Sequence, residues 1–311
     1  MAAYLGLYRG GKLRERVDKA LSLLENCSVC PRSCGVNRLA GDMGKCRTSR
    51  QAMVSSYGAH FGEEAPLVGR YGSGTIFFAN CNLECLFCQN YSISQLGEGQ
   101  KVDKEGLAYI MLSLQEERCH NINLVSPTHV VPQILEALEM AVESGLHLPL
   151  VYNSGGYDSI ETLKTLDGVV DIYMPDMKYD NEQTARELSG IGNYPDLNKA
   201  AVKEMHRQTG DLQIDEGGVA QRGLLVRHLV LPHGLAGTKG ILHFLGEEIS
   251  RNTYLNIMAQ YHPCYKALQI RGLERSVSSA EFREALLFAR EAGLSRLDRI
   301  HSTELLPILS E

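Results

Sequence analysis

The sequence predicts an α/β protein built on a partial (β/α)6 barrel, with a small cysteine knuckle near its N-terminus. From Gly74 onward, six short apolar runs alternate with stretches of helical periodicity, a pattern typical of a parallel sheet with right-handed crossovers. Before them, residues 27–46 hold four cysteines among turn-forming residues, in a stretch too small to bury a core without a staple. Six units are too few for a closed eight-stranded barrel, and a doubly wound sheet is the alternative.

The first 70 residues are expected to form an N-terminal helix and the knuckle. Helical periodicity covers residues 14–26, and residues 52–59 suit a strand. Residues 71–311 are expected to form the barrel with a C-terminal helical extension.

Six strands and six helices are expected in the repeating part of the chain. The strands are 74–80, 121–126, 148–153, 169–174, 224–231 and 253–258. The helices are 103–117, 131–144, 158–167, 181–189, 196–208 and 237–251. Asp103 and Asp158 suit N-caps, and Pro132 suits the first turn of its helix.

Three segments lie outside this repeat. Residues 62–74 carry several glycines and a proline, which predicts a connecting segment, with Glu63 and Glu64 in a solvated acidic loop. Residues 211–223 interrupt the rhythm and suit a surface hairpin. The amphipathic stretch 279–292 suits a helix that packs on the barrel or covers its bottom.

Charge and composition limit the class of protein. The net charge of -6 argues against a general electrostatic grip on nucleic acid. No stretch reaches the roughly 20 apolar residues that a membrane span needs, and the first residues lack the pattern of a secretory signal. The expected location is therefore cytoplasmic, with no membrane partner. Nine cysteines, seven of them in two tight groups, then indicate metal or cluster ligation rather than disulfides.

The strongest signal is CNLECLFC, which places Cys81, Cys85 and Cys88 directly after the first strand of the repeat. In β/α barrels the loops after the strands carry the chemistry. Three thiolates this close can bind three corners of a [4Fe-4S] cubane and leave the fourth iron open. A zinc site with a fourth ligand elsewhere is the alternative, but a zinc knuckle has no need of five further β/α units.

The spacing C-x3-C-x2-C, with Phe87 before the last cysteine, resembles the signature of the radical S-adenosylmethionine (SAM) superfamily. The phrases CPRSCGVNR, GSGTIFFANCNLECLFCQNYSISQ and MPDMKY resemble homologues of pyruvate formate-lyase activating enzyme with an N-terminal cysteine knuckle. The resemblance covers the chain from about Cys27 onward. It implies a radical SAM barrel, an oxidoreductase with a [4Fe-4S] cluster, SAM as cofactor and an electron donor such as flavodoxin or ferredoxin.

The resemblance also suggests where SAM binds. Activating enzymes carry Gly-Gly-Glu after the second strand, whereas this chain reads Ser126-Pro127-Thr128-His129, so the acidic contact is missing. Ser126 and Thr128 still offer backbone carbonyls and hydroxyls, with a plain strand-to-helix turn as the alternative. After the third strand come Asn153 and Ser154, followed by two glycines that let a ligand approach the backbone closely.

Four further residues complete the expected SAM site. Asp176 and Lys178 match the family's Asp-x-Lys motif after the fourth strand, with a plain surface ion pair as the alternative. Arg227, within the fifth strand, matches an arginine that faces the SAM carboxylate, which a guanidinium binds in bidentate fashion. His262 after the sixth strand matches a histidine that contacts SAM. Of these, Asp176, Lys178 and His262 are expected to take part in catalysis.

The second cysteine group, Cys27, Cys30, Cys34 and Cys46, has the spacing C-x2-C-x3-C-x11-C. Four thiolates can close a structural zinc site that keeps the knuckle folded. A second iron–sulfur cluster has the same ligand count and would indicate electron relay. The sequence leaves both metals open.

The function expected from these features is reductive cleavage of SAM to a 5′-deoxyadenosyl radical that abstracts hydrogen. The resemblance implies a glycine of a partner protein as one target. A peptide or a small molecule is the alternative substrate, and a non-catalytic iron–sulfur sensor is the alternative class. Modification of nucleic acid is disfavoured by the acidic balance of the chain.

Overall fold

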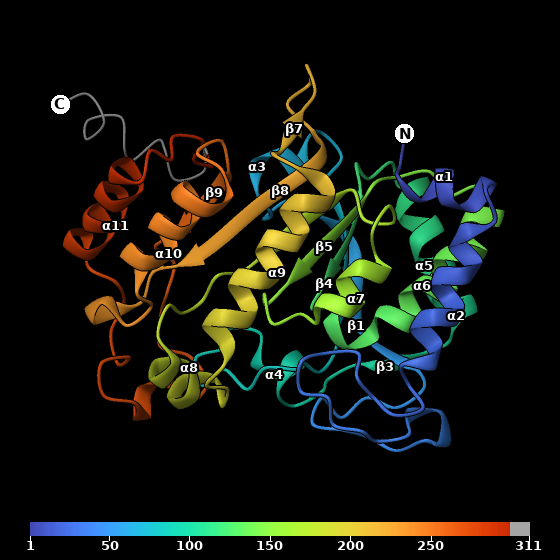
Figure 1. The fold of residues 1–311 in the computed structure, drawn as a ribbon, viewed down its shortest axis with the longest axis horizontal. Helices are drawn as coiled ribbons and strands as arrows, with labels where there is room; N and C mark the ends of the chain where they lie inside the picture. Colours follow the sequence, from blue (N-terminus) through green and yellow to red (C-terminus); the bar gives the residue numbers. More distant parts are fainter. Residues whose placement is uncertain (299–311) are drawn as a thin grey trace.

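The computed structural model describes residues 1–298 as an α/β fold around one mixed sheet (Figure 1). Residues 299–311 of the expected second unit lie outside the described part. The strands are β1 (Ala52–His60), β2 (Ser73–Phe78), β3 (Gln100–Val102), β4 (Ile122–Val125), β5 (Leu150–Ser154), β6 (Ile172–Pro175), β7 (Gln213–Ile214), β8 (Ala220–Leu229) and β9 (Tyr254–Met258).

Six of these strands run parallel, in the order β2-β4-β5-β6-β8-β9. They correspond to the six predicted strands, and neighbours in the sheet follow each other along the chain. This sequential order is that of a barrel and not of a doubly wound sheet, whose order reverses at a switch point. Within the described residues β9 pairs with β8 and not with β2, so the barrel is partial, as predicted.

Three antiparallel strands extend the parallel set. β1 pairs with β2, and β3 pairs with β1, so the N-terminal part of the chain contributes a strand to the sheet. β7 pairs with β8, which confirms the hairpin expected at 211–223. The sequence predicts that β1 is a strand from its apolar residues. It does not predict that β1 pairs with β2, because pairing depends on contacts between distant parts of the chain.

The helices are α1 (Tyr4–Arg9), α2 (Lys12–Ser22), α3 (Ala65–Val68), α4 (Tyr91–Ser94), α5 (Lys104–Glu116), α6 (Val131–Glu143), α7 (Ile160–Thr165), α8 (Glu182–Ser189), α9 (Tyr194–Thr209), α10 (Thr238–Phe244) and α11 (Ser279–Glu291). Asp103 caps α5 by accepting from the backbone N–H of Gly106, as predicted. Pro132 lies in the first turn of α6, as predicted. The cap expected at Asp158 is wrong, because α7 begins at Ile160 and the Asp158 carboxylate is buried elsewhere.

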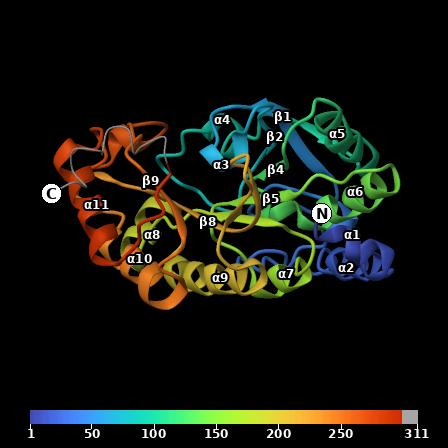
Figure 2. The same ribbon diagram turned by 90° about the horizontal axis from the view of Figure 1, so that it is seen from above.

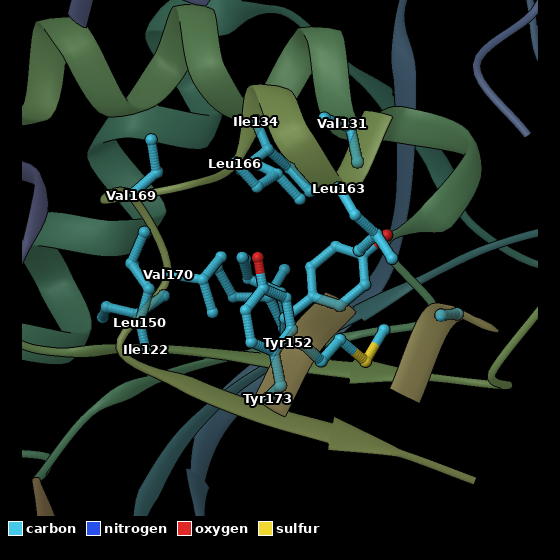
Figure 3. Packing of buried hydrophobic residues seen from close by; sticks show 14 of the residues in the cluster. Ile122, Val131, Ile134, Leu150, Tyr152, Leu163, Leu166, Val169, Val170 and Tyr173 are labelled. Atoms are coloured by element: carbon cyan, nitrogen blue, oxygen red, sulfur yellow. The ribbon is translucent and has the colours of Figure 1, made fainter. Parts of the chain in front are cut away.

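The main hydrophobic core lies between the sheet and its helices. Tyr152 and Tyr173 of adjacent strands meet edge to face and pack under α6 and α7 (Figure 3). Leu163 of α7 has no exposed surface, and burying such a side chain contributes about 2 kcal/mol. Tyr4 and Leu13 of α1 and α2 belong to the same core, so the N-terminal helices stabilise the barrel from outside.

A second, smaller cluster fills the inside of the barrel. Successive side chains of a strand point to opposite faces, so Tyr152 faces the helices while Val151 faces inward. Val151, Met174 and Leu225 form this inner cluster with Leu67 of α3. In a strand, the residue two positions further along faces the same side. Asn153, Asp176 and Arg227 therefore form a polar layer inside the barrel next to these apolar residues.

Helices near the two ends of the described residues cover the outside of the barrel. α11 packs on α10 beside β9, which confirms that it packs on the barrel, while α1 and α2 lie at the opposite side (Figures 1 and 2). Ser278 and Glu281 form a capping box at the start of α11, which satisfies backbone donors there. No helix in the described residues has the length and apolar character needed to cross a membrane.

Candidate active site

The loop after β2 carries Cys81, Cys85 and Cys88 to the carboxyl ends of the parallel strands, where all three border one cavity of about 260 Å³. The cavity is also lined by residues from the ends of five further strands. These include Val125, Ser126, Thr128, Asn153, Ser154, Asp176, Lys178, Arg227, Leu229, Met258 and Gln260. The residues predicted to bind the barrel cluster and SAM therefore converge on one place, with one exception described below.

Hydroxyl groups contact two of the three thiols. Ser189 donates to the Sγ atom of Cys85 over 3.0 Å and is itself 2.7 Å from the hydroxyl of Tyr179. The Oγ atom of Ser94 lies 3.1 Å from the Sγ atom of Cys88. Hydrogen bonds to sulfur tune the potential of an iron–sulfur centre. Ser189 comes from α8, far along the chain, and sequence reasoning missed it.

Phe87 packs beneath the cysteine loop. Its ring meets those of Tyr179 and Tyr261 edge to face, with centroids 6.3 and 6.0 Å apart. Such contacts add about 1 kcal/mol each beyond the burial of area. The geometry makes Phe87 an apolar wall that holds the loop in place.

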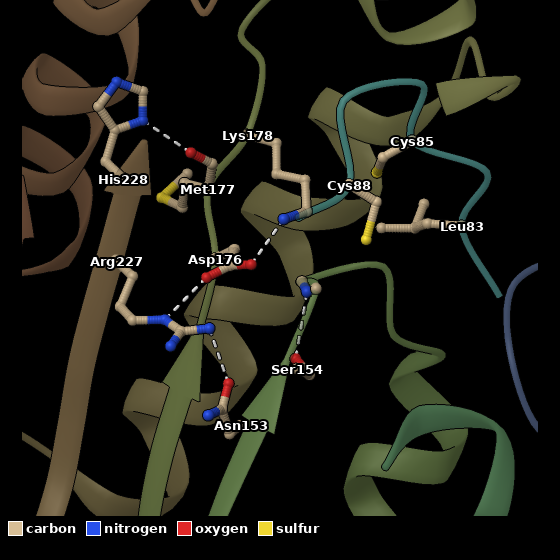
Figure 4. Close-up of polar contacts among 12 residues, drawn as sticks. Leu83, Cys85, Cys88, Asn153, Ser154, Asp176, Met177, Lys178, Arg227 and His228 are labelled. Atoms are coloured by element: carbon tan, nitrogen blue, oxygen red, sulfur yellow. Dashed lines mark hydrogen bonds and ion pairs between the residues drawn. The ribbon is translucent and has the colours of Figure 1, made fainter. Parts of the chain in front are cut away.

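The polar layer inside the barrel is centred on Arg227. Its Nε atom donates to the Oδ1 atom of Asp176 over 2.9 Å, and a terminal nitrogen donates to the Oδ1 atom of Asn153 over 2.8 Å (Figure 4). Asn153, Asp176 and Arg227 lie two positions after the inner residues Val151, Met174 and Leu225, so strand alternation brings them together.

Lys178 joins this layer to the cysteine loop. Its Nζ atom lies 2.6 Å from the Oδ2 atom of Asp176 (Figure 4), and Cys85 is close enough to act on its charge. Burial disfavours the charged form of Lys178, but Asp176 and Cys85 raise its pKa on balance. Burial likewise opposes ionisation of Asp176, and Arg227 and Lys178 nevertheless lower its pKa. The group is thus a carboxylate held between two cations.

Glu63 and Glu64 correct one expectation. The solvated acidic loop is wrong, because the two side chains are only 8% and 4% exposed. Glu64 accepts from the side-chain amide of Asn256 over 3.0 Å, and its carboxylate lies 3.8 Å from the Arg227 guanidinium. Burial raises the pKa of Glu64 and Arg227 opposes the increase, so Glu64 places a second carboxyl group beside Arg227, through contacts that no local pattern reveals.

Thr128 and Ser154 line the cavity, but their hydroxyl groups donate hydrogen bonds within the protein and not to the cavity. Both donate to Asp158 over 2.7 Å, and Tyr152 donates to the same carboxylate over 2.8 Å. Asp158 thus fastens two loops of the cavity wall together, a role the sequence did not suggest. Ser126 has a positive φ of 59°, a strained conformation for a residue with a side chain.

His262 is the exception to the convergence. It is exposed and does not border the cavity, although its Nδ1 atom lies 3.3 Å from the side chain of Gln89, which does. The structure places His262 at the rim of the site.

Gly156 gives a first prediction. Its φ is +74°, and a Cβ atom there would overlap the carbonyl oxygen of Asp176 and the side-chain amide of Asn198. We expect Gly156→Ala to lower the free energy of unfolding by about 2–4 kcal/mol, from left-handed strain plus overpacking. Gly145→Ala is the matched control, because Gly145 also has a positive φ but an open surrounding. If denaturant titrations showed the same loss of unfolding free energy in both variants, the close packing around Gly156 would be contradicted.

His228 is buried behind the site and is neutral. Its Nδ1 atom lies 2.7 Å from the carbonyl oxygen of Met177, which can only accept, so Nδ1 carries the proton and Nε2 accepts from Thr238. Burial lowers the pKa of His228 to about 4.

This shift gives a second prediction. Between pH 6.5 and 4 the unfolded chain binds a proton that native His228 does not, so stability falls as pH falls through that range. The slope is about 1.4 kcal/mol per pH unit for this histidine. His228→Asn keeps a donor for Met177 but does not titrate, so its unfolding free energy, measured by denaturant between pH 4.5 and 7, should change less steeply by about that amount. Parallel curves for the two proteins would contradict the neutral burial.

The three thiols fit an iron–sulfur cluster by type and by environment. Burial raises the pKa of Cys81 to about 12 and also raises that of Cys85, so these thiols ionise readily only when a metal binds. Lys178 opposes the increase at Cys85. The cavity beside them carries the negative charge of Asp176 and the positive charges of Lys178 and Arg227. Charges of both signs suit the ammonium and carboxylate groups of an amino acid.

Comparisons with known proteins agree with this geometry. The model of the family described as Radical SAM superfamily matches residues 75–212. Uncharacterized protein MJ0674 of Methanocaldococcus jannaschii is 31% identical over 90% of this chain and 78% of its own length. Uncharacterized protein MJ0808 of the same organism is 24% identical over 78% of this chain and 72% of its own.

One solved structure supports the fold. A radical SAM methyltransferase from Sphaerobacter thermophilus superposes with a TM-score of 0.50 at 14% identity, covering 72% of this chain and 66% of that one. A partial parallel barrel whose first loop brings three cysteines to a charged cavity defines a class of cluster-dependent enzymes. The chain belongs to the radical SAM superfamily. Membership implies a [4Fe-4S] cluster, SAM, an electron donor and reductive cleavage of SAM to a radical.

Proposed function

We propose that this enzyme acts as an activase, abstracting hydrogen from a glycine of a partner protein. The observation that carries the proposal is the cavity that joins the cysteine loop to the layer of Asn153, Asp176 and Arg227, at the mouth of a barrel in which β9 does not pair with β2 among the described residues. We infer that the mouth of this cavity accommodates a loop of a partner protein. Similarity to activating enzymes in the cysteine motif and in MPDMKY adds to this support.

In this proposal Cys81, Cys85 and Cys88 hold the cluster. A bound cluster, reduced by a flavodoxin- or ferredoxin-like donor, would supply the one electron needed to cleave SAM into methionine and a 5′-deoxyadenosyl radical, and hydrogen abstraction from the substrate would yield 5′-deoxyadenosine and a substrate radical.

The protein's own residues bind and orient SAM. Arg227 uses donors not taken by Asp176 and Asn153 to bind the SAM carboxylate, and Asp176 orients Arg227 and favours the charged form of Lys178. Backbone groups of Ser126 and Asn153 line the cofactor. His262 contributes from the rim, where it meets the substrate or the outer part of SAM.

Deuterium transfer tests the identity of the target. The co-purified partner is prepared with α-deuterated glycine and incubated anaerobically with the reconstituted enzyme, SAM and dithionite. We expect 5′-deoxyadenosine to gain about one mass unit per transfer, together with a glycyl radical in the electron paramagnetic resonance spectrum. Cleavage of SAM with neither signal would remove the glycine target while leaving the enzyme class intact. Modification of a peptide or small molecule would then be the account to pursue.

A further inference from the structure

The four N-terminal cysteines lie in one folded loop. Cys27, Cys30 and Cys46 are buried, and Cys34 is exposed. A Cβ atom on Gly44 would overlap the Sγ atom of Cys34, so the part of the loop that carries Cys46 packs closely against Cys34. Burial raises the pKa of Cys30, and Cys46, Cys27 and Cys34 act on it at close range. The four thiols therefore face a common region.

In neither cysteine group are the thiols arranged as the ligands of a metal ion. Among residues 1–298 no group of three or more His, Cys, Asp or Glu side chains has the arrangement that holds a metal ion. This applies equally to Cys81, Cys85 and Cys88. The arrangement of the thiols therefore does not distinguish the two groups and does not by itself show that the knuckle binds a metal, so an independent observation is needed.

Arg38 supplies that observation. Its side chain has no exposed surface, yet it forms no ion pair with any carboxylate in the described part of the chain. It donates to the carbonyl oxygens of Ser49 and His129 over 3.1 and 2.8 Å. One terminal nitrogen lies 3.9 Å from the Sγ atom of Cys27, and the other is buried without a hydrogen-bond partner.

A buried guanidinium cannot lose its proton, so it requires a negative charge nearby. The group beside Arg38 that can carry one is the thiol of Cys27, and thiols become thiolates when they bind a metal. Four thiolates around a divalent ion leave two negative charges in excess. We propose that Cys27, Cys30, Cys34 and Cys46 hold a metal centre as thiolates and that Arg38 is its buried counter-cation.

The knuckle also holds the segment that leads into the barrel cysteines. Arg32, between Cys30 and Cys34, donates to the carbonyl oxygen of Asn82 over 2.6 Å. The amide of Asn80 donates to the carbonyl oxygen of Arg47, next to Cys46, over 3.4 Å. These contacts flank Cys81 on both sides. The folded knuckle therefore contacts the start of the loop that carries Cys81.

Zinc and an iron–sulfur cluster share this thiolate chemistry, and elemental analysis separates them. The test uses the full chain with Cys81, Cys85 and Cys88 replaced by alanine, purified anaerobically from medium containing both metals. We expect either about one zinc per chain or the iron and sulfide of one cluster. Further replacement of Cys30 and Cys46 by serine should lower that content at least tenfold. Absence of stoichiometric zinc and iron from the triple variant would overturn the proposal.

Arg38→Met tests the counter-cation by the sign of its effect. With a thiolate centre present, removing the cation should speed metal release to excess EDTA about tenfold and lower the unfolding temperature. Without one, replacing an unpaired buried charge by an apolar side chain should raise that temperature. Arg9→Met, at an exposed arginine of α1, controls for the change of charge. Unchanged release with a raised unfolding temperature contradicts the proposal. Neither measurement involves SAM, so failure here is distinct from failure of the proposed activity.

Discussion

Replacing Cys85 with alanine abolishes SAM cleavage and leaves the barrel folded. Cys85 is one of three thiols on the loop after β2, and two thiolates are too few to hold a cluster with one open iron. Its side chain lies at the carboxyl ends of the strands, outside the main core, so the loss of one sulfur has little effect on the fold. We expect turnover at least 1000-fold below wild type, a loss of over about 4 kcal/mol in transition-state stabilisation, with reduced bound iron.

Cys119→Ala is the matched control, because Cys119 is a buried thiol next to the end of α5 and away from the cavity. Both variants are reconstituted anaerobically and assayed for iron, 5′-deoxyadenosine and far-ultraviolet circular dichroism. Retained cleavage in Cys85→Ala would show that the cluster is held elsewhere. Loss of the folded spectrum would show that the loop supports the barrel.

Replacing Asp176 with asparagine destabilises the protein and weakens SAM binding together. Asp176 lies between Arg227 and Lys178, and its neutral isostere leaves two partly buried cations facing each other with only Glu64 nearby. Breaking such a pair costs about 3–5 kcal/mol. The corresponding fall in unfolding temperature is roughly 5–8 °C for a chain of this size. Affinity for SAM should fall at least tenfold, because Arg227 and Lys178 lose their fixed orientation.

Asp167→Asn makes the same change in a solvent-exposed pair with Arg207 and should lower stability by at most about 1 kcal/mol. Thermal unfolding and equilibrium SAM binding of the two variants, each reconstituted with cluster, give the comparison. If Asp176→Asn unfolds with wild-type stability but binds SAM poorly, its role is contact with the ligand. If both properties stay at the wild-type level, the charged layer has no part in the site.

Much of the fold was predictable because it depends on local patterns. Buried parallel strands are short apolar runs, and the helices between them show their own period, so all six units were found. The convergence of Asn153, Asp176 and Arg227 follows from the same logic, since each lies at or near the carboxyl end of a strand and faces inward. The cysteine loop was predictable from its spacing and its position after β2.

The contacts that the sequence did not reveal all join distant parts of the chain. Glu64 meets Asn256 across 192 positions, and Ser189 meets Cys85 across 104. Asp158 has the sequence context of a helix cap, but three hydroxyls from the cavity wall bind it instead. Such roles depend on which loops the fold brings together, and residue type and spacing carry no record of that.

The most direct test of the account is anaerobic incubation of the reconstituted wild-type protein with SAM and dithionite, followed by assay for 5′-deoxyadenosine. The account predicts that 5′-deoxyadenosine forms in step with methionine, and that it disappears when Cys81, Cys85 or Cys88 is replaced. A protein that holds an intact cluster and binds SAM, yet forms no 5′-deoxyadenosine either alone or with its partner protein, would contradict the account and indicate an iron–sulfur sensor.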